Sequence, residues 1–202
     1  AKTHFMLTGK HPHRDQTERA IHVRRHPADV LLSATNHARL IGTSDVDTRD
    51  QKRAFAKTFI RFGGSPDWIK SGYGTWEQHA STWNKAPFPV LCLTYEELKA
   101  DTAAQLRRIM DFLEHPIDEQ RLAAAIRRAD FDSMQKLEVS EKQSGEASLF
   151  RGGAESLQQG SLFVNKGQTG RNLAELGDDI AEMFNKRFAQ PLAQYGYPAQ
   201  SS

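Results

Sequence analysis

The spacing of apolar residues along the chain predicts short strands that alternate with longer helices. Residues 20–24 (Ala-Ile-His-Val-Arg) and 89–95 (Pro-Val-Leu-Cys-Leu-Thr-Tyr) are the clearest strand candidates, and residues 2–7 are a third, weaker one. Because residues 89–95 are almost continuously apolar, we expect that strand to be covered on both faces, as parallel strands usually are.

Between and after these runs, apolar residues recur at helical spacing. Helices are predicted over residues 28–40, 48–62, 75–85, 102–115, 118–128 and 174–188. Phe55, Phe59 and Phe62 would face the core from the second of these helices. The alternation of strands and helices predicts an α/β fold with a central parallel sheet flanked by helices. Residues 143–159, rich in Gly, Ser and Gln, are predicted to form a mobile loop.

Composition narrows the class of protein. A chain of 202 residues, 38% of them hydrophobic, is long enough for one domain with a hydrophobic core. The net charge is +2, so overall charge points to neither nucleic acid nor a membrane as a partner. The single cysteine, Cys92, excludes an internal disulfide and fits a reducing compartment, which predicts a cytoplasmic location. Since the chain opens at Ala1 with polar residues, we expect a domain that is incomplete at its N-terminus.

Arg25 lies where the predicted strand 20–24 meets the helix that follows. A helix N-terminus attracts anions through its free backbone N–H groups and its dipole, and a guanidinium adds a charged fork. Ser33, in the second helical turn, could reach the same anion. Alternation along the strand puts Arg24 and Arg25 on opposite sides, so only one of them can face such a site. The alternative for Arg25 is an ion pair with Asp29, which we expect to stabilise the helix N-terminus.

Four stretches spread over the chain share their residue pattern, and their order, with a known family. They are residues 2–4 (Lys-Thr-His), 25–33 (Arg-His-Pro-Ala-Asp through Ser), 93–99 (Leu-Thr-Tyr-Glu-Glu-Leu-Lys) and 163–170 (Phe-Val-Asn-Lys-Gly-Gln-Thr-Gly). With them the chain resembles the sulfotransferases that use 3′-phosphoadenosine 5′-phosphosulfate (PAPS). The resemblance implies a P-loop-type sulfotransferase fold in a single domain over residues 1–202.

The resemblance also assigns roles to individual residues. It implies that His4 is the catalytic base and that Lys2 faces the charge developing at the sulfuryl group. It implies that Arg25 and Ser33 grip the 3′-phosphate of the cofactor. The other implied cofactor contacts are Tyr95, Phe131 and Met134 against the adenine, and Phe163, Asn165, Lys166 and Gly167 in a loop that closes over the 3′-phosphate.

Several of these residues have an ordinary structural alternative. His4 could belong to a frayed chain end, and Lys2 could be an exposed surface lysine. Tyr95 could pack in the core at the end of its strand, and Phe131 and Met134 could be core residues of a short helix. The tryptophans Trp76 and Trp83 and the phenylalanines Phe55, Phe59 and Phe62 are expected in the core rather than in an acceptor pocket. No metal site is expected, because His11 and His13 lack a third ligand.

The chain departs from the family pattern at two places. The family's PKSGTTW-type segment, which cradles the phosphosulfate and supplies a catalytic lysine, does not occur in residues 1–202. Asn165 stands where the family has an arginine, so an ionic contact with phosphate is lost there, worth about 1 kcal/mol or more. Arg171, six residues later, could partly compensate.

These observations predict an enzyme that moves a sulfuryl group from PAPS to a hydroxyl or amine of a small-molecule acceptor. Sulfuryl transfer, like phosphoryl transfer, needs in-line orientation, charge neutralisation at the leaving group and removal of a proton from the acceptor. The alternative is a catalytically silent protein that binds 3′-phosphoadenosine 5′-phosphate (PAP) without transfer. A PKSGTTW-like segment upstream would favour the enzyme.

Overall fold

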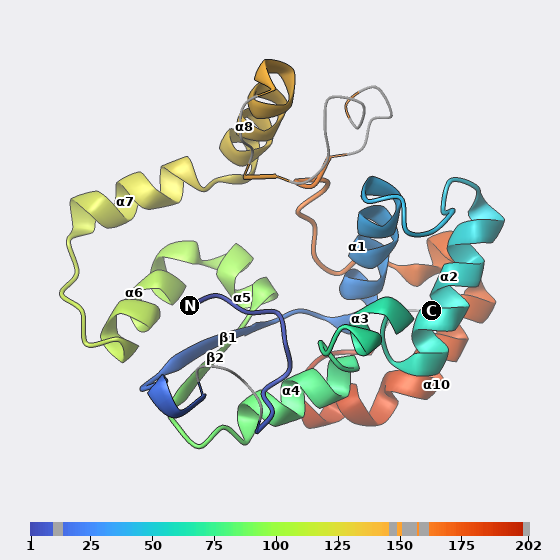
Figure 1. The fold of residues 1–202 in the computed structure, drawn as a ribbon, viewed down its shortest axis with the longest axis horizontal. Coiled ribbons are helices and arrows are strands. Elements are labelled where there is room, and N and C mark those ends of the chain that lie inside the picture. The colour runs from blue at the N-terminus through green and yellow to red at the C-terminus, as the bar shows by residue number, and fades with distance from the viewer. Residues whose placement is uncertain (10–13, 146–148, 151–156, 158–161, 200–202) are drawn as a thin grey trace.

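The computed structural model describes residues 1–9, 14–145, 149–150, 157 and 162–199. Its elements are η1 (Arg14–Gln16), β1 (Ala20–Arg24), α1 (Pro27–Leu40), α2 (Arg49–Phe62), α3 (Pro66–Lys70), α4 (Trp76–Asn84), β2 (Val90–Thr94), α5 (Tyr95–Ala100), α6 (Thr102–Phe112), α7 (Glu119–Arg128), α8 (Phe131–Ser144), η2 (Leu173–Leu176) and α10 (Asp178–Gln194). β1 and β2 pair in parallel, with Ala20 opposite Val90 and Arg24 opposite Thr94. Helices α6 and α4 lie on opposite sides of this strand pair in Figure 1.

The main hydrophobic core lies beside the sheet, between helices α1, α2 and α10. Its largest fully buried side chains include Leu31, Phe59 and Phe184. The rings of Phe184 and Phe188 stack with their centroids 4.6 Å apart. Helix α1 packs into this core and follows directly on β1 (Figure 1). The junction between them is therefore fixed by the sheet before it and by the core after it.

Local capping explains where several helices begin. Thr48, Thr75 and Thr94 each cap a helix in a capping box, in which the residue three positions later returns a hydrogen bond to the cap. The box at Thr94 starts α5 directly after β2, which places Tyr95 in the first turn of a helix at the carboxyl end of the strand. Pro27 occupies the first position of α1, where a missing N–H costs nothing.

The strand predicted over residues 2–7 is wrong. Its backbone groups bond to α4 and to the turn before it rather than to another strand. The N–H of Leu7 donates to the hydroxyl of Thr82 at 3.1 Å, and the indole of Trp83 donates to the carbonyl of Phe5 at 3.2 Å. These contacts hold the segment across α4, away from a sheet edge.

The strand predicted over residues 89–95 is confirmed as β2, but its expected burial on both faces is wrong. Among the residues of β2 only Leu93 is fully buried. The sheet has two strands in the described part of the chain, so each strand is covered by a neighbour along one edge only. On β1, Val23 is 47% exposed, so this strand too is incompletely covered.

Several helix boundaries and faces differ from the prediction. The residue Phe62 is 50% exposed and Ile60 is buried instead, because Gly63 ends α2 in the left-handed region. Helix α6 ends at Phe112 rather than at 115, and Leu113 is 43% exposed. The helix predicted over 174–188 is divided at Gly177 (φ 125°) into η2 and α10.

The loop predicted over residues 143–159 is wrong at its start. Helix α8 continues to Ser144 and ends at Gly145, whose φ of 68° suits a left-handed cap. Polar residues surround most of α8, so the sequence indicated only a short helix there, as the alternative for Phe131 and Met134. Residues 146–148, 151–156 and 158–161 of the predicted loop lie outside the described residues.

Candidate functional site

The two adjacent arginines at the end of β1 have different partners. The guanidinium of Arg24 lies over the ring of Tyr195, 4.8 Å from its centroid. The guanidinium of Arg25 lies over the ring of Tyr95, 4.5 Å from its centroid, and donates to the carbonyl of Gln168. Arg25 is therefore fixed between the start of α5 and a loop from late in the chain, by a cation–π contact and a charge-assisted hydrogen bond.

A cavity of about 150 Å³ lies beside Arg25, and almost all of the predicted cofactor residues line it. These lining residues are Arg25, Ser33, Tyr95, Phe131, Phe163, Asn165, Lys166 and Gly167. Met134, on the next turn of α8, is the predicted residue that does not line this cavity. The structure thus brings together residues from four separate stretches of the sequence.

The cavity is cationic. Arg25, Lys166 and Arg171 line it together with a single carboxylate, that of Asp29. Asp29 is 1% exposed, and its charge is already engaged: Oδ2 accepts the backbone N–H of Gly170 at 2.9 Å, and Oδ1 that of Arg171 at 3.1 Å. Asp29 Oδ2 also lies 3.9 Å from Nε of Arg25, so the ion pair named as the alternative for Arg25 is present. With three cations and one carboxylate, the cavity keeps a net positive charge that suits an anionic ligand.

Asp29 does more than the sequence indicated. We expected it to stabilise the N-terminus of the helix, but its carboxylate also holds the loop at residues 170–171, which lies 141 positions away along the chain. Arg171 lines the cavity while its guanidinium donates to Glu175 at 2.7 Å. Arg171 therefore supplies a positive charge to the cavity that Asn165 cannot supply.

Gly167 has a steric reason to be glycine. Its φ is +58°, and a Cβ placed there would lie 2.4 Å from the ring of Phe131. Only glycine allows the loop to approach Phe131 this closely without strain. The ring of Phe131 also lies 5.8 Å from the ammonium of Lys99, so the loop rests on an aromatic ring at the beginning of α8.

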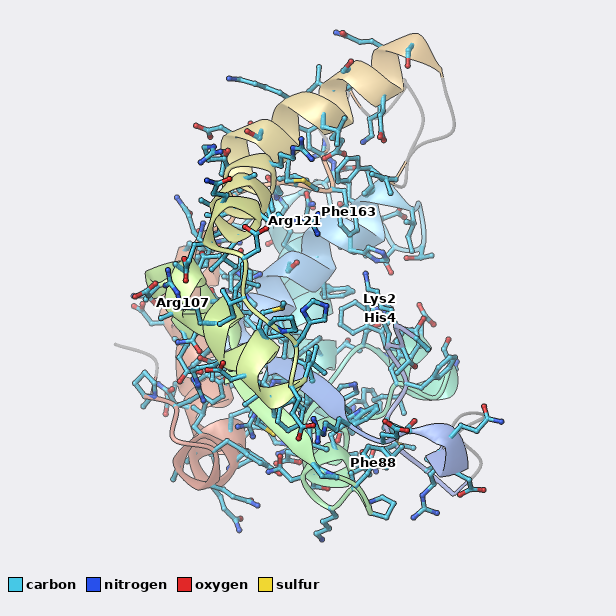
Figure 2. The ribbon with its side chains drawn as sticks, turned by 90° about the vertical axis from the view of Figure 1, so that its left-hand side faces the viewer. Lys2, His4, Phe88, Arg107, Arg121 and Phe163 are labelled. Carbon is cyan, nitrogen blue, oxygen red and sulfur yellow. The ribbon has the colours of Figure 1, made fainter. Side chains whose placement is uncertain are left out.

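A second, larger cavity of about 800 Å³ adjoins the first and shares Arg25, Ser33 and Phe163 with it. Lys2 and His4 line this larger cavity; Figure 2 shows them beside one another, with Phe163 above them in that view. Its apolar walls include Phe55, Phe59, Trp68, Tyr73 and Trp76. Trp76 and Phe59 thus serve both the core, as expected, and a cavity wall, whereas Trp83 is buried and does not line the cavity.

Two histidines of the larger cavity were missed by the sequence analysis. His22 on β1 is 4% exposed, and its Nε2 lies 3.2 Å from Nδ1 of His79 on α4. Burial, followed by His79 and Arg24, lowers the pKa of His22 to about 3. Burial also lowers the pKa of His79, which is hydrogen-bonded to the backbone of His4. Both imidazoles are therefore neutral at physiological pH, and no local sequence pattern marks either of them.

The described residues contain no candidate metal site and no candidate membrane span. Among the described residues, no group of three or more His, Cys, Asp or Glu side chains is placed to hold a metal ion. His11 and His13 lie outside the described residues. None of the helices that the structure describes is long and apolar enough to cross a membrane.

An α/β fold with a cationic cavity at a strand–helix junction defines an anion-binding α/β protein. The chain belongs to the PAPS-dependent sulfotransferase family, whose sulfotransferase domain model matches residues 1–196. This confirms the family that the four sequence stretches indicated.

The chain matches curated relatives at low identity. Luciferin sulfotransferase from Photinus pyralis is 26% identical over 166 residues, which cover 82% of this chain and 42% of the relative. Sulfotransferase 2B1 from Mus musculus is 29% identical over 157 residues, covering 75% and 41%. Cytosolic sulfotransferase 12 from Arabidopsis thaliana is 27% identical over 169 residues, covering 80% and 46%. The chain therefore spans less than half the length of these relatives.

Solved structures share the fold. Mouse sulfotransferase SULT7A1 complexed with PAP superposes with a TM-score of 0.56 at 19% identity, over 87% of this chain and 62% of that one. Retinol dehydratase in a complex with retinol and PAP superposes with a TM-score of 0.61 at 21% identity, over 90% and 49%. The predicted α/β sulfotransferase fold is confirmed.

Proposed function

We propose that the protein transfers a sulfuryl group from PAPS to a hydroxyl or amine of a small-molecule acceptor. The observation that carries this proposal is the convergence of distant residues on one cationic cavity, which opens beside a larger cavity containing Lys2 and His4. The structural neighbours mouse SULT7A1 and retinol dehydratase were solved in complexes with PAP, the product that PAPS leaves after transfer.

The smaller cavity fits the 3′-phosphate end of such a nucleotide. Arg25 and Lys166 provide charge, Ser33 provides a hydroxyl, and Arg171 adds a third cation close to the loop backbone. The rings of Tyr95 and Phe131, at the first turns of α5 and α8, offer apolar surface for a purine. Each of these groups would bind and orient the nucleotide.

The larger cavity suits the acceptor, and it contains the side chains proposed for the proton transfer. PAPS, when bound, supplies the sulfuryl group. His4 would take the proton from the attacking hydroxyl or amine, and Lys2 would stand near the charge that develops during transfer. The aromatic walls, with Trp68 and Trp76 among them, suit an apolar small molecule. Two structural neighbours were solved with such molecules, retinol and androsterone.

We also propose that the protein acts in the cytoplasm. Its single cysteine, Cys92, is a free thiol in the structure, which suits a reducing compartment. The plant relative is named as a cytosolic enzyme.

Calorimetric titration of the full-length protein with PAP tests the proposal, with Arg25→Ala compared against wild type. Loss of a charged, multiply bonded guanidinium should weaken binding by about 2 to 3 kcal/mol, or roughly 30- to 150-fold. Arg24→Ala is the matched control, because that neighbouring guanidinium packs on Tyr195. Equal PAP affinity in Arg25→Ala and wild type would contradict the role of Arg25. Tight PAP binding without transfer from PAPS to any acceptor would instead indicate the silent nucleotide-binding protein.

A further inference from the structure

The loop that lines the cationic cavity is held at each end by a buried carboxylate. At the far end of the loop, the carboxylate of Asp29 accepts hydrogen bonds from two successive backbone N–H groups. At its near end the carboxylate of Glu138, on α8, does the same: Oε1 accepts the N–H of Phe163 and Oε2 that of Val164, each at 2.7 Å. The residues between these two attachments include those that face the cavity, residues 165–168.

Glu138 is completely buried, with an exposure of 0%. Its charge is balanced by Lys142, one helical turn later, whose Nζ lies 2.5 Å from Oε1 and whose side chain is also fully buried. A buried carboxylate is strongly destabilising unless a cation and hydrogen-bond donors surround it. Lys142 provides the cation, and the two loop amides provide donors. The environment of Glu138 is therefore complete only while the loop is in place.

A second side chain of α8 supports the same attachment. The amide of Gln135 donates to the carbonyl of Val164 at 2.9 Å and to that of Asn165 at 3.3 Å. Helix α8 thus binds the N–H groups of the first loop residues through Glu138 and their carbonyls through Gln135. Figure 1 shows the loop leaving the base of α8 and passing to α1, on which Asp29 lies.

We propose that Glu138 is a positioning residue for the anion site. It fixes the start of the loop to α8, so that residues 165–168 are already arranged to meet the phosphate. Glu138 does not itself line the cavity, and it acts through the loop backbone. The identity of the anion rests on the proposed function, whereas the attachment of the loop does not. Glutamine at this position would present one acceptor and one donor, so at least one of the two amides would lose its partner.

The test compares Glu138→Gln with wild type in the full-length protein, by amide hydrogen exchange without ligand and by titration with PAP. We expect the amides of Phe163 and Val164 to exchange about tenfold faster or more, while those of Gly170 and Arg171 keep their protection. We expect the Kd for PAP and the KM for PAPS to rise about tenfold, with the KM for the acceptor unchanged. A purely structural defect would affect both substrates.

Two further variants make the result decisive. Glu141→Gln removes a carboxylate from the same helix, one that accepts the N–H of Leu149, and should leave the exchange of Phe163 and Val164 and the Kd for PAP as in wild type. If Glu138→Gln does not fold because the buried charge of Lys142 is no longer balanced by Glu138, the double variant E138Q/K142M, which removes both charges together, takes the place of the single variant.

Unchanged exchange at Phe163 and Val164 in a folded variant would overturn the attachment. Faster exchange with unchanged affinity for PAP would overturn the positioning role. If wild type itself does not bind PAP, the proposed function fails, and the exchange measurement still decides whether Glu138 holds the loop.

Discussion

The two adjoining cavities share a wall but are built in different ways. The smaller one is lined by cations and by a loop whose backbone is held by buried carboxylates, whereas the larger one is lined by aromatic rings and by the neutral histidines His22 and His79. Arg25, Ser33 and Phe163 belong to both. Under the proposed function, the smaller cavity would hold the charged nucleotide, and the larger one would hold the apolar acceptor and the base that takes its proton.

The largest expected effect is on the reaction rate. It would distinguish catalysis in the larger cavity from nucleotide binding in the smaller one. Replacement of His4 by alanine should lower kcat by about 100- to 10,000-fold, because a positioned general base contributes that much to rate. The Kd for PAP, measured by calorimetry on the same protein, should not change, since His4 lines only the larger cavity. A parallel loss of PAP affinity would show that the two cavities do not divide the work in this way.

The second effect concerns the neutral histidines of the larger cavity. The pKa of His22 is lowered from 6.5 to about 3 in the folded protein, so the unfolded chain binds the proton first as pH falls. The stability associated with neutral His22 is complete above pH 6.5 and is lost progressively as pH falls from 6.5 toward 3. At pH 5 the loss from this one group is about 2 kcal/mol.

Replacement of His22 by phenylalanine tests this dependence. The variant keeps an aromatic ring against Trp83, on which His22 stacks at 5.9 Å, and removes the titrating group. Urea unfolding at pH 7.5 and pH 5 should show a smaller acid-induced loss of stability in His22→Phe than in wild type. Equal losses in the two proteins would contradict a buried neutral His22.

The third effect is confined to the smaller cavity. Gly167→Ala should weaken PAP binding by about tenfold, because the new methyl group meets the ring of Phe131 and the backbone has a positive φ. Gly170→Ala is the matched control, since its φ is +68° and nothing lies within 4 Å of the added Cβ. It carries the same backbone strain without the clash. Calorimetry should therefore show a smaller loss in the control, and an equal loss would assign the effect to strain alone.

The smallest effect concerns the charge that replaces the family arginine. Arg171→Gln should weaken PAP binding by about fivefold, in line with the loss of one charge-assisted contact. Restoring a cation at the other position, in the double variant N165R/R171Q, should recover most of the affinity. Glu175→Gln removes only the ion-pair partner of Arg171 and should not weaken binding. A double variant as weak as the single one would show that positions 165 and 171 are not equivalent.

The elements that position the site could largely be predicted from the sequence. The strand before Arg25, the helix that carries Ser33, and the strand that ends before Tyr95 all lie where local apolar spacing and capping residues indicated. Eight of the nine cofactor residues that the family resemblance implied line one cavity. Residues 2–7 failed as a strand because an extended apolar run does not reveal its hydrogen-bond partner, which here is α4.

The sequence by itself determined which residues stand next to each strand and helix end, because periodicity and capping depend on neighbours a few positions apart. Only the tertiary structure decided what holds the site together. Asp29 meets residues 170–171, His22 meets His79, and the loop is attached at Glu138. These contacts join side chains and backbone groups from 25 to 142 positions apart. A hydrogen bond over such a distance leaves no pattern in the sequence, because its geometry exists only once the helices have packed.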